Sequence, residues 1–359
     1  MVRVVMILLM AAILAIIMPV FAQGFNIHQL RQMVAKTNSS CLLVFGDSSV
    51  DPGNNNHLPL APKSNFPPYG KDLFTGRRPT GRFTNGRLAT DFIAEAFGYV
   101  NVIQAFLDPT IKEEALLHGV SFASAGSGYD ELTTNLSKAL PIWKQMEYFR
   151  HYKIHLSREV GEMKAEEIIR NAILIVSMGT NDFLQNYYID PTRSQHFTVK
   201  QYQNYLISRM LRFVKTMHEM GARRVAIVGV PPFGCMPIVK TLKDESKCDD
   251  EYNKVAFSFN SKIKQKLAVL NASLAMQTAY IDIYRVIASA IHSPKKYGFE
   301  ETSKGCCGSG LIEFGDTCKG MSTCADPTKY VFWDAIHPTQ KMYEFIAIEA
   351  LKSLAASMN

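Results

Sequence analysis

Apolar and polar positions follow one another in blocks along most of the chain. Short apolar runs are separated by longer amphipathic stretches, a pattern typical of a parallel sheet with helices on both faces. We expect strands over residues 41–45, 120–123, 173–178, 224–230 and 280–284. The third and fourth runs are continuous and rich in Val and Ile, as strands buried on both faces should be. The pattern therefore predicts an α/β fold.

Two amphipathic segments have clear helical spacing. Between the third and fourth strands, apolar side chains recur every three or four residues from Tyr202 to Met217, and we expect Gly221 to end that helix. We interpret its apolar stripe as core packing rather than a ligand groove. A closing helix is predicted over residues 338–356, with Pro338 near its start. Its inner face is expected to carry Met342, Phe345 and Ile346.

Residues 51–82 interrupt this pattern. They contain six prolines and four glycines, so regular structure is not expected there. A loop directly after the first strand lies at the carboxyl end of the sheet, where α/β folds bind ligands. We therefore expect this loop and neighbouring loops to build most of the substrate pocket. No repeat or interdomain linker occurs, which predicts one domain over residues 23–359.

The N-terminus resembles a secretory signal peptide. Arg3 precedes an apolar run over residues 4–22, and Val20 and Ala22 fit the −3 and −1 positions of a cleavage site. We expect residues 1–22 to be removed and the mature chain to be soluble and extracellular. The run is also long enough to be retained as a membrane anchor, so that alternative stays open.

Cysteine usage and glycosylation sequons agree with export. Four of the seven cysteines lie within residues 306–324, which predicts a disulfide-stapled loop whose four cysteines alone allow three pairings. A zinc site is the alternative, but the adjacent thiolates fit zinc spacing poorly. The odd count leaves one free thiol, for which Cys41 is the candidate. Asn38, Asn135 and Asn271 begin glycosylation sequons.

Charge and motifs argue against nucleic acid or nucleotide binding. The formal net charge is +7, but the basic residues are scattered rather than gathered into a patch. Neither of the glycine-rich motifs that cradle phosphates, G-x-x-x-x-G-K-[ST] and G-x-G-x-x-G, is present. We therefore expect no nucleic-acid partner.

Ser48 and His337 are the candidates for acid–base chemistry. Ser48 follows the first expected strand, and a serine hydroxyl needs a base to act as a nucleophile at neutral pH. Of the nine histidines, only His337 has an acidic residue, Asp334, three positions before it. A carboxylate so close can orient the imidazole and stabilise its charged form. The alternatives are that Ser48 is only a turn residue and that Asp334 and His337 cap the last helix.

Acyl transfer also needs donors for a developing oxyanion. Residues 119–128 form a glycine-rich block after the second expected strand, where the backbone N–H of Gly126 is unhindered. Asn181, in a Gly-Thr-Asn-Asp sequence after the third strand, offers a carboxamide donor.

Four motifs in this order carry a resemblance to a known family. A Gly-Asp-Ser sequence at Ser48, the glycine-rich block, Gly-x-Asn-Asp and a C-terminal Asp-x-x-His resemble the GDSL esterase/lipase family of the SGNH hydrolase superfamily, in particular its plant branch. Supporting segments lie at residues 51–56 (DPGNNN), 67–70 (PPYG), 81–87 (GRFTNGR), 229–237 (GVPPFGCMP) and 331–339 (VFWDAIHPT). The resemblance begins near residue 41 and continues to the C-terminus.

The resemblance implies a fold and a site. The fold would be a three-layer α/β/α sandwich with a five-stranded parallel sheet, and the enzyme would need no metal or organic cofactor. Ser48 would be the nucleophile and the first oxyanion donor, with Gly126 and Asn181 as the second and third. His337 would be the base, oriented by Asp334.

Two positions depart from the family pattern. Ser49 replaces the family leucine, with little catalytic effect expected because this position would offer mainly its backbone. Ser121 stands where many members carry asparagine, which leaves Gly128 as the alternative donor to Gly126.

The function expected on this basis is secreted carboxylester hydrolysis by two-step acyl transfer. The substrates would be esters of lipids, acylated sugars, phenolics or cutin-like polymers, and the destination would be the cell wall or extracellular space. An acyltransferase with the same residues and a non-catalytic binding protein are the alternatives. The sequence leaves the natural substrate and the oligomeric state open.

Overall fold

The computed structural model describes residues 26–39, 41–73, 78–100, 102–244 and 246–358. The expected signal peptide, residues 1–22, lies outside the described residues. None of the helices in the described ranges is long and apolar enough to cross a bilayer.

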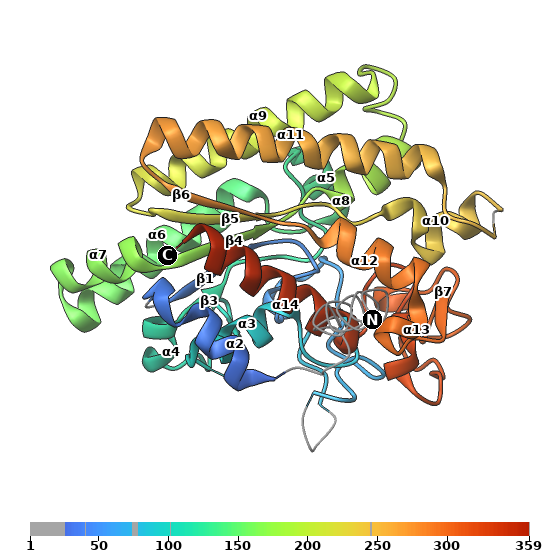
Figure 1. The fold of residues 1–359 in the computed structure, drawn as a ribbon, viewed down its shortest axis with the longest axis horizontal. Coiled ribbons are helices and arrows are strands. Elements are labelled where there is room, and N and C mark those ends of the chain that lie inside the picture. The colour runs from blue at the N-terminus through green and yellow to red at the C-terminus, as the bar shows by residue number, and fades with distance from the viewer. Residues whose placement is uncertain (1–25, 40, 74–77, 101, 245, 359) are drawn as a thin grey trace, which may run out of the picture.

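A parallel six-stranded sheet runs through the centre of the molecule (Figure 1). Its strand order is β2-β3-β1-β4-β5-β6. In this order the strands are Gln104–Ala105, Val120–Ser121, Leu42–Gly46, Ile173–Ser177, Arg224–Val228 and Gln277–Ile281. Every residue of β1 and β4 is buried, as expected for strands covered on both faces.

The five expected strands are all present, but β3 and β5 each end two residues earlier than expected and β6 begins three residues earlier. A two-residue strand, β2, adds a sixth member at the sheet edge. The last strand ends at Ile281 instead of continuing to residue 284, because Asp282 caps the helix α12, Ile283–His292. The Asp282 side chain accepts a hydrogen bond from the backbone N–H of Arg285, which starts the helix.

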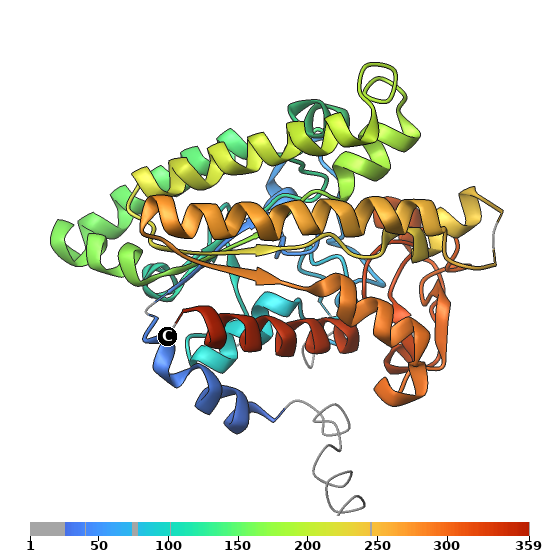
Figure 2. The ribbon, with the colours of Figure 1, turned by 45° about the horizontal axis from the view of Figure 1, so that its top comes forward.

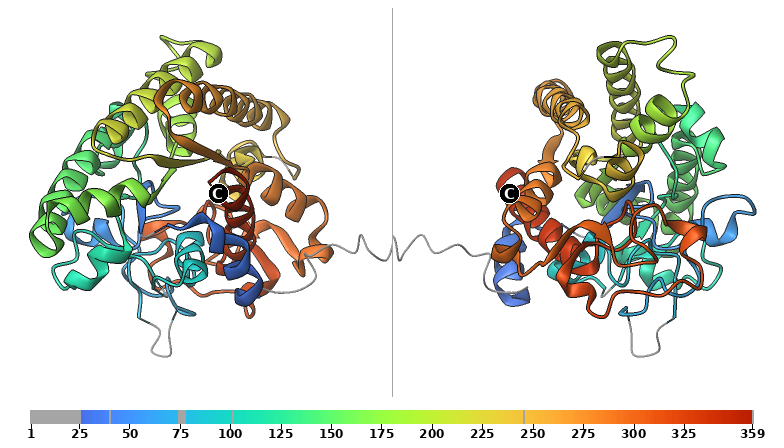
Figure 3. Two further views of the ribbon diagram at one scale, coloured as in Figure 1. Left: turned by 60° about the vertical axis from the view of Figure 1, so that its left-hand side comes forward. Right: turned by 90° about the vertical axis from the view of Figure 1, so that its right-hand side faces the viewer.

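Helices cover both faces of the sheet, giving three layers (Figure 2). One face carries α12 together with α2, α3 and α14, which are Ile27–Val34, Ala89–Phe97 and Gln340–Ser357. The other carries α6, α9 and α11, which are Ile142–Val160, Val199–Glu219 and Asp250–Leu274. The side views in Figure 3 show α9 and α11 on the opposite side of the sheet from α2 and α14. The fold is the α/β/α sandwich that the sequence predicts.

Further helices lie between these elements along the chain. They are α4 (Glu113–His118), α5 (Glu131–Ser137), α7 (Glu162–Asn171), α8 (Thr180–Phe183), α10 (Pro237–Leu242) and α13 (Pro294–Tyr297). A π-helical segment, Leu184–Ile189, continues α8.

Both helices predicted from periodicity are confirmed. Helix α9 begins after Thr198, which forms a capping box with Gln201, and ends just before Gly221, whose φ is +108°. Helix α14 begins two residues later than expected because Thr339 is its N-cap, accepting from the N–H of Met342. The side chains expected on its inner face, Met342, Phe345 and Ile346, are buried.

A second, two-stranded sheet lies beside the carboxyl end of the main sheet. It pairs β7, Glu301–Gly305, with β8, Tyr330–Phe332. The disulfides Cys306–Cys324 and Cys307–Cys318 staple the segment between them, as predicted, and Cys235 pairs with Cys248. Because the crowded cysteines are paired, they are not zinc ligands. Within the described ranges, no group of three acidic, His or Cys residues could hold a metal ion.

Cys41 is the free and buried thiol that the sequence predicts. Its sulfur lies 3.4 Å from the Tyr152 hydroxyl, and burial raises the pKa of the thiol to about 12. The thiol therefore stays protonated and unreactive at neutral pH.

Residues 51–73 and 78–82 have little regular structure, as expected, beyond a 3-10 turn at Asn54–His57. Polar side chains of this loop are nevertheless buried. The Asn54 carboxamide donates to the carbonyls of Ser121 and Ala123, each at 2.8 Å. These hydrogen bonds fasten the loop to the end of β3 and to the segment that follows it.

Candidate active site

Ser48 lies just beyond the carboxyl end of β1, where the chain turns sharply. The turn requires glycine at position 46, because φ is +147° and an added Cβ would lie 2.1 Å from the carbonyl oxygen of Ser177. The N–H of Asp47 then donates to that carbonyl at 3.0 Å. Ser48 is thereby presented, half-buried, at the edge of the sheet.

Ser48, His337 and Asp334 form one hydrogen-bonded chain. Ser48 Oγ lies 2.8 Å from His337 Nε2, and His337 Nδ1 lies 2.8 Å from Asp334 Oδ2. The Asp334 side chain is fully buried and that of His337 nearly so. With the ring proton on Nδ1, Nε2 is free to accept the serine proton. The arrangement is therefore competent for nucleophilic catalysis.

The turn that holds Asp334 and His337 is built by the carboxylate itself. Asp334 Oδ1 accepts from the backbone N–H groups of Ile336 and His337, at 2.9 and 2.7 Å. The Trp333 N–H donates to the His337 carbonyl at 2.7 Å, which closes the turn. Since Thr339 caps α14, the alternative that Asp334 and His337 serve as helix caps is wrong.

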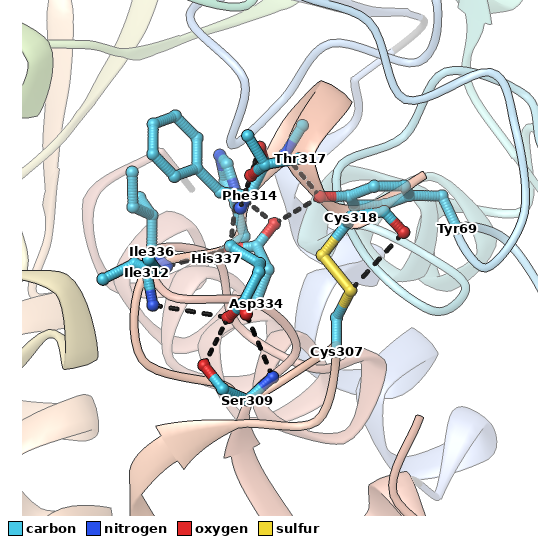
Figure 4. Close-up of a disulfide and its surroundings, with 12 residues drawn as sticks. Tyr69, Cys307, Ser309, Ile312, Phe314, Thr317, Cys318, Asp334, Ile336 and His337 are labelled. Carbon is cyan, nitrogen blue, oxygen red and sulfur yellow. Dashed lines mark hydrogen bonds and ion pairs between the residues drawn. A yellow bond between two sulfur atoms is a disulfide. The ribbon is translucent and has the colours of Figure 1, made fainter. Parts of the chain in front are cut away.

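Tyr69 is a member of the site that the sequence did not single out. Its hydroxyl donates to Asp334 Oδ2 at 2.7 Å and accepts from the N–H of Gly315 at 2.7 Å (Figure 4). Tyr69 is buried, and burial together with the Asp334 charge raises the pKa of the phenol well above its usual value. The phenol therefore remains a donor. The only sequence signal was its place in the PPYG segment.

A small apolar cluster surrounds this phenol. Its buried members are Phe66, Tyr69, Phe83, Ala125, Trp333 and the cysteines 306, 307 and 318. The disulfide Cys307–Cys318 thus packs on the same side of Asp334 as Tyr69 (Figure 4). The Ala335 N–H, in the Asp334 turn, also donates a hydrogen bond to the carbonyl of Glu313 in the stapled loop, at 2.9 Å. The loop and the Asp334 turn are one packed unit.

Asn181 lies at the start of α8, beside the glycine-rich block. Its carboxamide donates to the Ser127 carbonyl at 3.0 Å, and Asn181 and Ser48 line the same cavity. The structure thus places Asn181 beside Ser48 in one cavity. It places neither Gly126 nor Gly128 on the wall of that cavity.

Both glycines are nevertheless restricted by their surroundings. Gly126 has φ +88°, and an added Cβ would lie 2.7 Å from Cβ of Ser137. An added Cβ at Gly128 would lie 2.3 Å from Asp182 Oδ1. Side chains at either position would therefore displace the block.

Asp182 is a second buried residue to which the sequence motifs assign no role. Its buried carboxylate accepts from the N–H groups of Tyr129 and Asp130 and from the Thr133 hydroxyl. Burial is the largest influence on this carboxyl and raises its pKa to about 7. Asn181 and Asp182 together hold the glycine-rich block against the end of β4.

The two departures from the family pattern have structural roles. Ser49 Oγ donates to Asp47 Oδ1 and lies within hydrogen-bond distance of Ser177 Oγ, each at 2.7 Å, so the expectation that position 49 offers mainly its backbone is wrong. Ser121 Oγ donates to the Val50 carbonyl at 2.9 Å and does not line the cavity.

A cavity of about 930 Å³, a volume that includes space open to solvent, adjoins the triad residues. Ser48, Asn181 and His337 line part of it, and the rest is lined by side chains from α3, α12 and α14, from the sheet, from the segment that follows β5 and from the turns beside Ser48 and His337. No residue of the loop at 51–73 and 78–82 is among them. The expectation that this loop builds the pocket is therefore wrong: it packs against Asp334 and the glycine-rich block instead.

Residues 42–350 match the family model described as GDSL-like Lipase/Acylhydrolase. The chain belongs to the GDSL lipase family. GDSL esterase/lipase At5g45950 of Arabidopsis thaliana is 52% identical over 332 residues, 92% of this chain and 92% of that relative. GDSL esterase/lipase At4g26790 of the same plant is 43% identical over 331 residues, 89% of this chain and 94% of the relative. The chain is accordingly a GDSL-type serine ester hydrolase.

Solved structures are more distant from this GDSL chain. A catalytic mutant of Axe2, an acetylxylan esterase from Geobacillus stearothermophilus, is 12% identical and covers 88% of this chain and 94% of its own, with a TM-score of 0.40. So remote a likeness supports no statement about the substrate.

Proposed function

We propose that the enzyme hydrolyses carboxylic esters with Ser48 as nucleophile, His337 as general base and Asp334 as the group that orients the base. The observation that carries the proposal is the 2.8 Å contact between Ser48 Oγ and His337 Nε2. A buried carboxylate on the opposite ring nitrogen stabilises the imidazolium that forms during attack.

The reaction proceeds through an acyl-enzyme. Ser48 Oγ bonds to the ester carbonyl carbon while its proton passes to His337. The tetrahedral intermediate collapses as His337 returns that proton to the leaving alcohol. Water then gives a proton to His337 and its oxygen bonds to the acyl carbon, after which the acid leaves and Ser48 regains its proton.

The oxyanion is stabilised by the Ser48 N–H, the Asn181 carboxamide and a glycine N–H, with Gly126 proposed and Gly128 as the alternative. Support for Asn181 comes from its place in the cavity that Ser48 lines. A preorganised carboxamide needs no reorientation as the charge develops.

The test is hydrolysis of p-nitrophenyl esters by the wild-type protein and its Ser48→Ala and His337→Ala variants. Loss of several orders of magnitude in kcat in both variants supports the mechanism. Stoichiometric labelling by a fluorophosphonate that disappears in Ser48→Ala identifies the nucleophile independently of the substrate. Undiminished hydrolysis in Ser48→Ala would exclude it.

We further propose that residues 1–22 are a cleaved signal peptide and that the enzyme acts in the extracellular space or cell wall. Three disulfides support this, since disulfides persist in oxidising compartments. The side chains of Asn38, Asn135 and Asn271 are exposed, which suits glycosylation. Secreted protein beginning at Gln23 and carrying glycans removable by an endoglycosidase would agree with the proposal, and unprocessed intracellular protein would contradict it.

Each glycosylation site is best tested by replacing its asparagine with glutamine. At the Asn135 sequon, the hydroxyl of Ser137 donates to the Gly126 carbonyl at 2.7 Å. Replacing Ser137 would therefore disturb a proposed oxyanion loop as well as the sequon, whereas Asn135→Gln changes only an exposed side chain.

A further inference from the structure

The cavity beside Ser48 continues well beyond the reacting groups. Aspartate, serine, asparagine and histidine side chains line the end near Ser48, and the rest of the wall is mainly aliphatic, with Thr90 and Tyr343 as its polar members. The deeper wall includes Ile93, Ile175, Ile281, Ile287, Ile346 and Ala350, all of them buried. These residues come from α3, β4, β6, α12 and α14, so the cavity extends between the sheet and its covering helices.

Helix α14 gives the direction and length of this cavity. The residues preceding the helix, His337 and Pro338, lie at the catalytic end, and Tyr343, Ile346 and Ala350 follow along one helical face. From Tyr343 to Ala350 the helix rises about 10 Å, at roughly 1.5 Å per residue. In β4, Ser177 at the end of the strand and Ile175 two residues before it lie on the same face and both line the cavity. The cavity therefore runs from the carboxyl edge of the sheet inward along the strand.

We infer that this cavity binds the acyl chain of the ester, and that the preferred acyl group is aliphatic and of medium length. This inference rests on the proposed function, because it assigns the cavity to the part of the substrate that remains on Ser48. An extended chain advances about 1.2 Å per single bond, as in a polypeptide where three bonds span roughly 3.5 Å, so about 10 Å holds about eight carbons.

The acyl group fits this assignment better than the alcohol does. During the reaction the alcohol must leave and water must enter, whereas the acyl group stays bound to Ser48 between the two steps. A deep cavity behind the nucleophile suits the group that stays, and its open end suits the exchange of alcohol for water. Charged or polar acyl groups would leave their polar atoms without partners against these mainly aliphatic walls.

Ala350 is the position where this selectivity can be tested. Its small, buried side chain lines the cavity seven residues beyond Tyr343, so a larger side chain there shortens the space at the far end. The matched control is Ala356, an exposed residue of the same helix. Ala89 of α3 also lines the cavity and offers an independent site for the same substitution.

The experiment measures kcat/KM for p-nitrophenyl esters from acetate to palmitate with the wild type, Ala350→Leu and Ala356→Leu. In the wild type we expect kcat/KM to rise about tenfold to a hundredfold from acetate to octanoate, since each buried methylene contributes up to about fourfold. Ala350→Leu should lower octanoate turnover at least tenfold and leave acetate within about twofold, while Ala356→Leu keeps the wild-type profile. A flat profile, or one that Ala350→Leu does not change, overturns the inference.

Binding of octanoic acid separates this inference from the proposed function. Calorimetry with Ser48→Ala protein should detect octanoate binding that Ser48→Ala/Ala350→Leu weakens at least tenfold, whether or not Ser48 is the nucleophile. Equal binding by the two proteins overturns the inference. If Ala350→Leu does not reach the wild-type melting temperature, Ala89→Leu is measured in its place with the same expected loss.

Discussion

The hydroxyl oxygen of Tyr69 lies 2.7 Å from Oδ2 of Asp334, although 265 residues separate the two along the chain. The same oxygen accepts from the N–H of Gly315, in the loop stapled by Cys307–Cys318. Asp334 is thus held from three sides: by its own turn, by the loop that follows β1 and, through the phenol, by the disulfide loop. A carboxylate fixed in this way holds the His337 ring in one orientation towards Ser48.

Removing the phenol hydroxyl should weaken this orientation without altering the cavity. We expect Tyr69→Phe to lower kcat about tenfold with KM nearly unchanged, because a hydrogen bond to a charged group contributes roughly 1.5–3 kcal/mol and only part of that acts through Asp334. Steady-state kinetics on one ester give both parameters. Tyr280→Phe is the control, since its buried hydroxyl has no hydrogen-bond partner among the described residues. A changed KM with intact kcat would contradict a positioning role.

The disulfide loop and Tyr69 should act on Asp334 as one unit. Replacing Cys307 and Cys318 by serine frees the loop that carries Gly315, so kcat should fall at temperatures where the protein is still folded. Adding Tyr69→Phe to this variant should then lower kcat less than Tyr69→Phe does in the wild type. A double-mutant cycle measures the difference. Strictly additive losses would show that the loop does not act through the phenol.

Asn181→Ala should lower kcat by about a hundredfold to a thousandfold, as removal of an oxyanion donor does elsewhere. The carboxamide also holds the Ser127 carbonyl, so thermal unfolding must be measured alongside to separate lost stability from lost catalysis. Fluorophosphonate labelling at saturating reagent serves as a check that Ser48 and His337 remain assembled. An unchanged kcat would remove Asn181 from the mechanism.

The buried carboxyl of Asp182 should make stability depend on pH. Burial raises its pKa from 3.8 to about 7, so the folded state binds this proton more tightly than the unfolded state does. The resulting stabilisation is complete below about pH 4 and is lost as the pH rises through 7. Urea unfolding gives the free energy of unfolding of the wild type and of Asp182→Asn between pH 4 and 7.5. The wild-type value minus the variant value should fall by up to about 4 kcal/mol as the pH rises over this range. A constant difference would contradict the raised pKa, since other groups titrate in both proteins.

The elements of the fold were largely predictable because they rest on local periodicity. Continuous apolar runs gave β4 and β5, and the spacing from Tyr202 to Met217 gave α9. The end of β6 was missed because the competing signal, the cap at Asp282, depends on a single side chain. Two statements stay predictions: that residues 23–359 form one domain, and that residues 1–22 are removed.

In the candidate site, too, contacts between residues close in sequence were predictable and contacts between distant residues were not. Asp334 and His337 lie in one four-residue turn, so their spacing alone predicted their contact, and the family motifs pointed to Ser48 and Asn181. The role of Tyr69 could not be predicted from the sequence, because its partner is distant along the chain and a single phenol does not indicate which carboxylate it will contact. The place of residues 51–82, directly after the first strand, predicted that this loop would form the pocket. How the loop packs could not be predicted from its composition.

The sequence by itself determined the α/β alternation, the free thiol and the order of the motifs, because each depends on residues close together or on residue counts. The tertiary structure alone decided the disulfide pairing, the contact of Tyr69 with Asp334 and the aliphatic cavity along α14. These features join segments from separate elements, and their geometry depends on how helices and sheet pack. Packing is fixed by the fit of many side chains at once, which no local pattern in the sequence records.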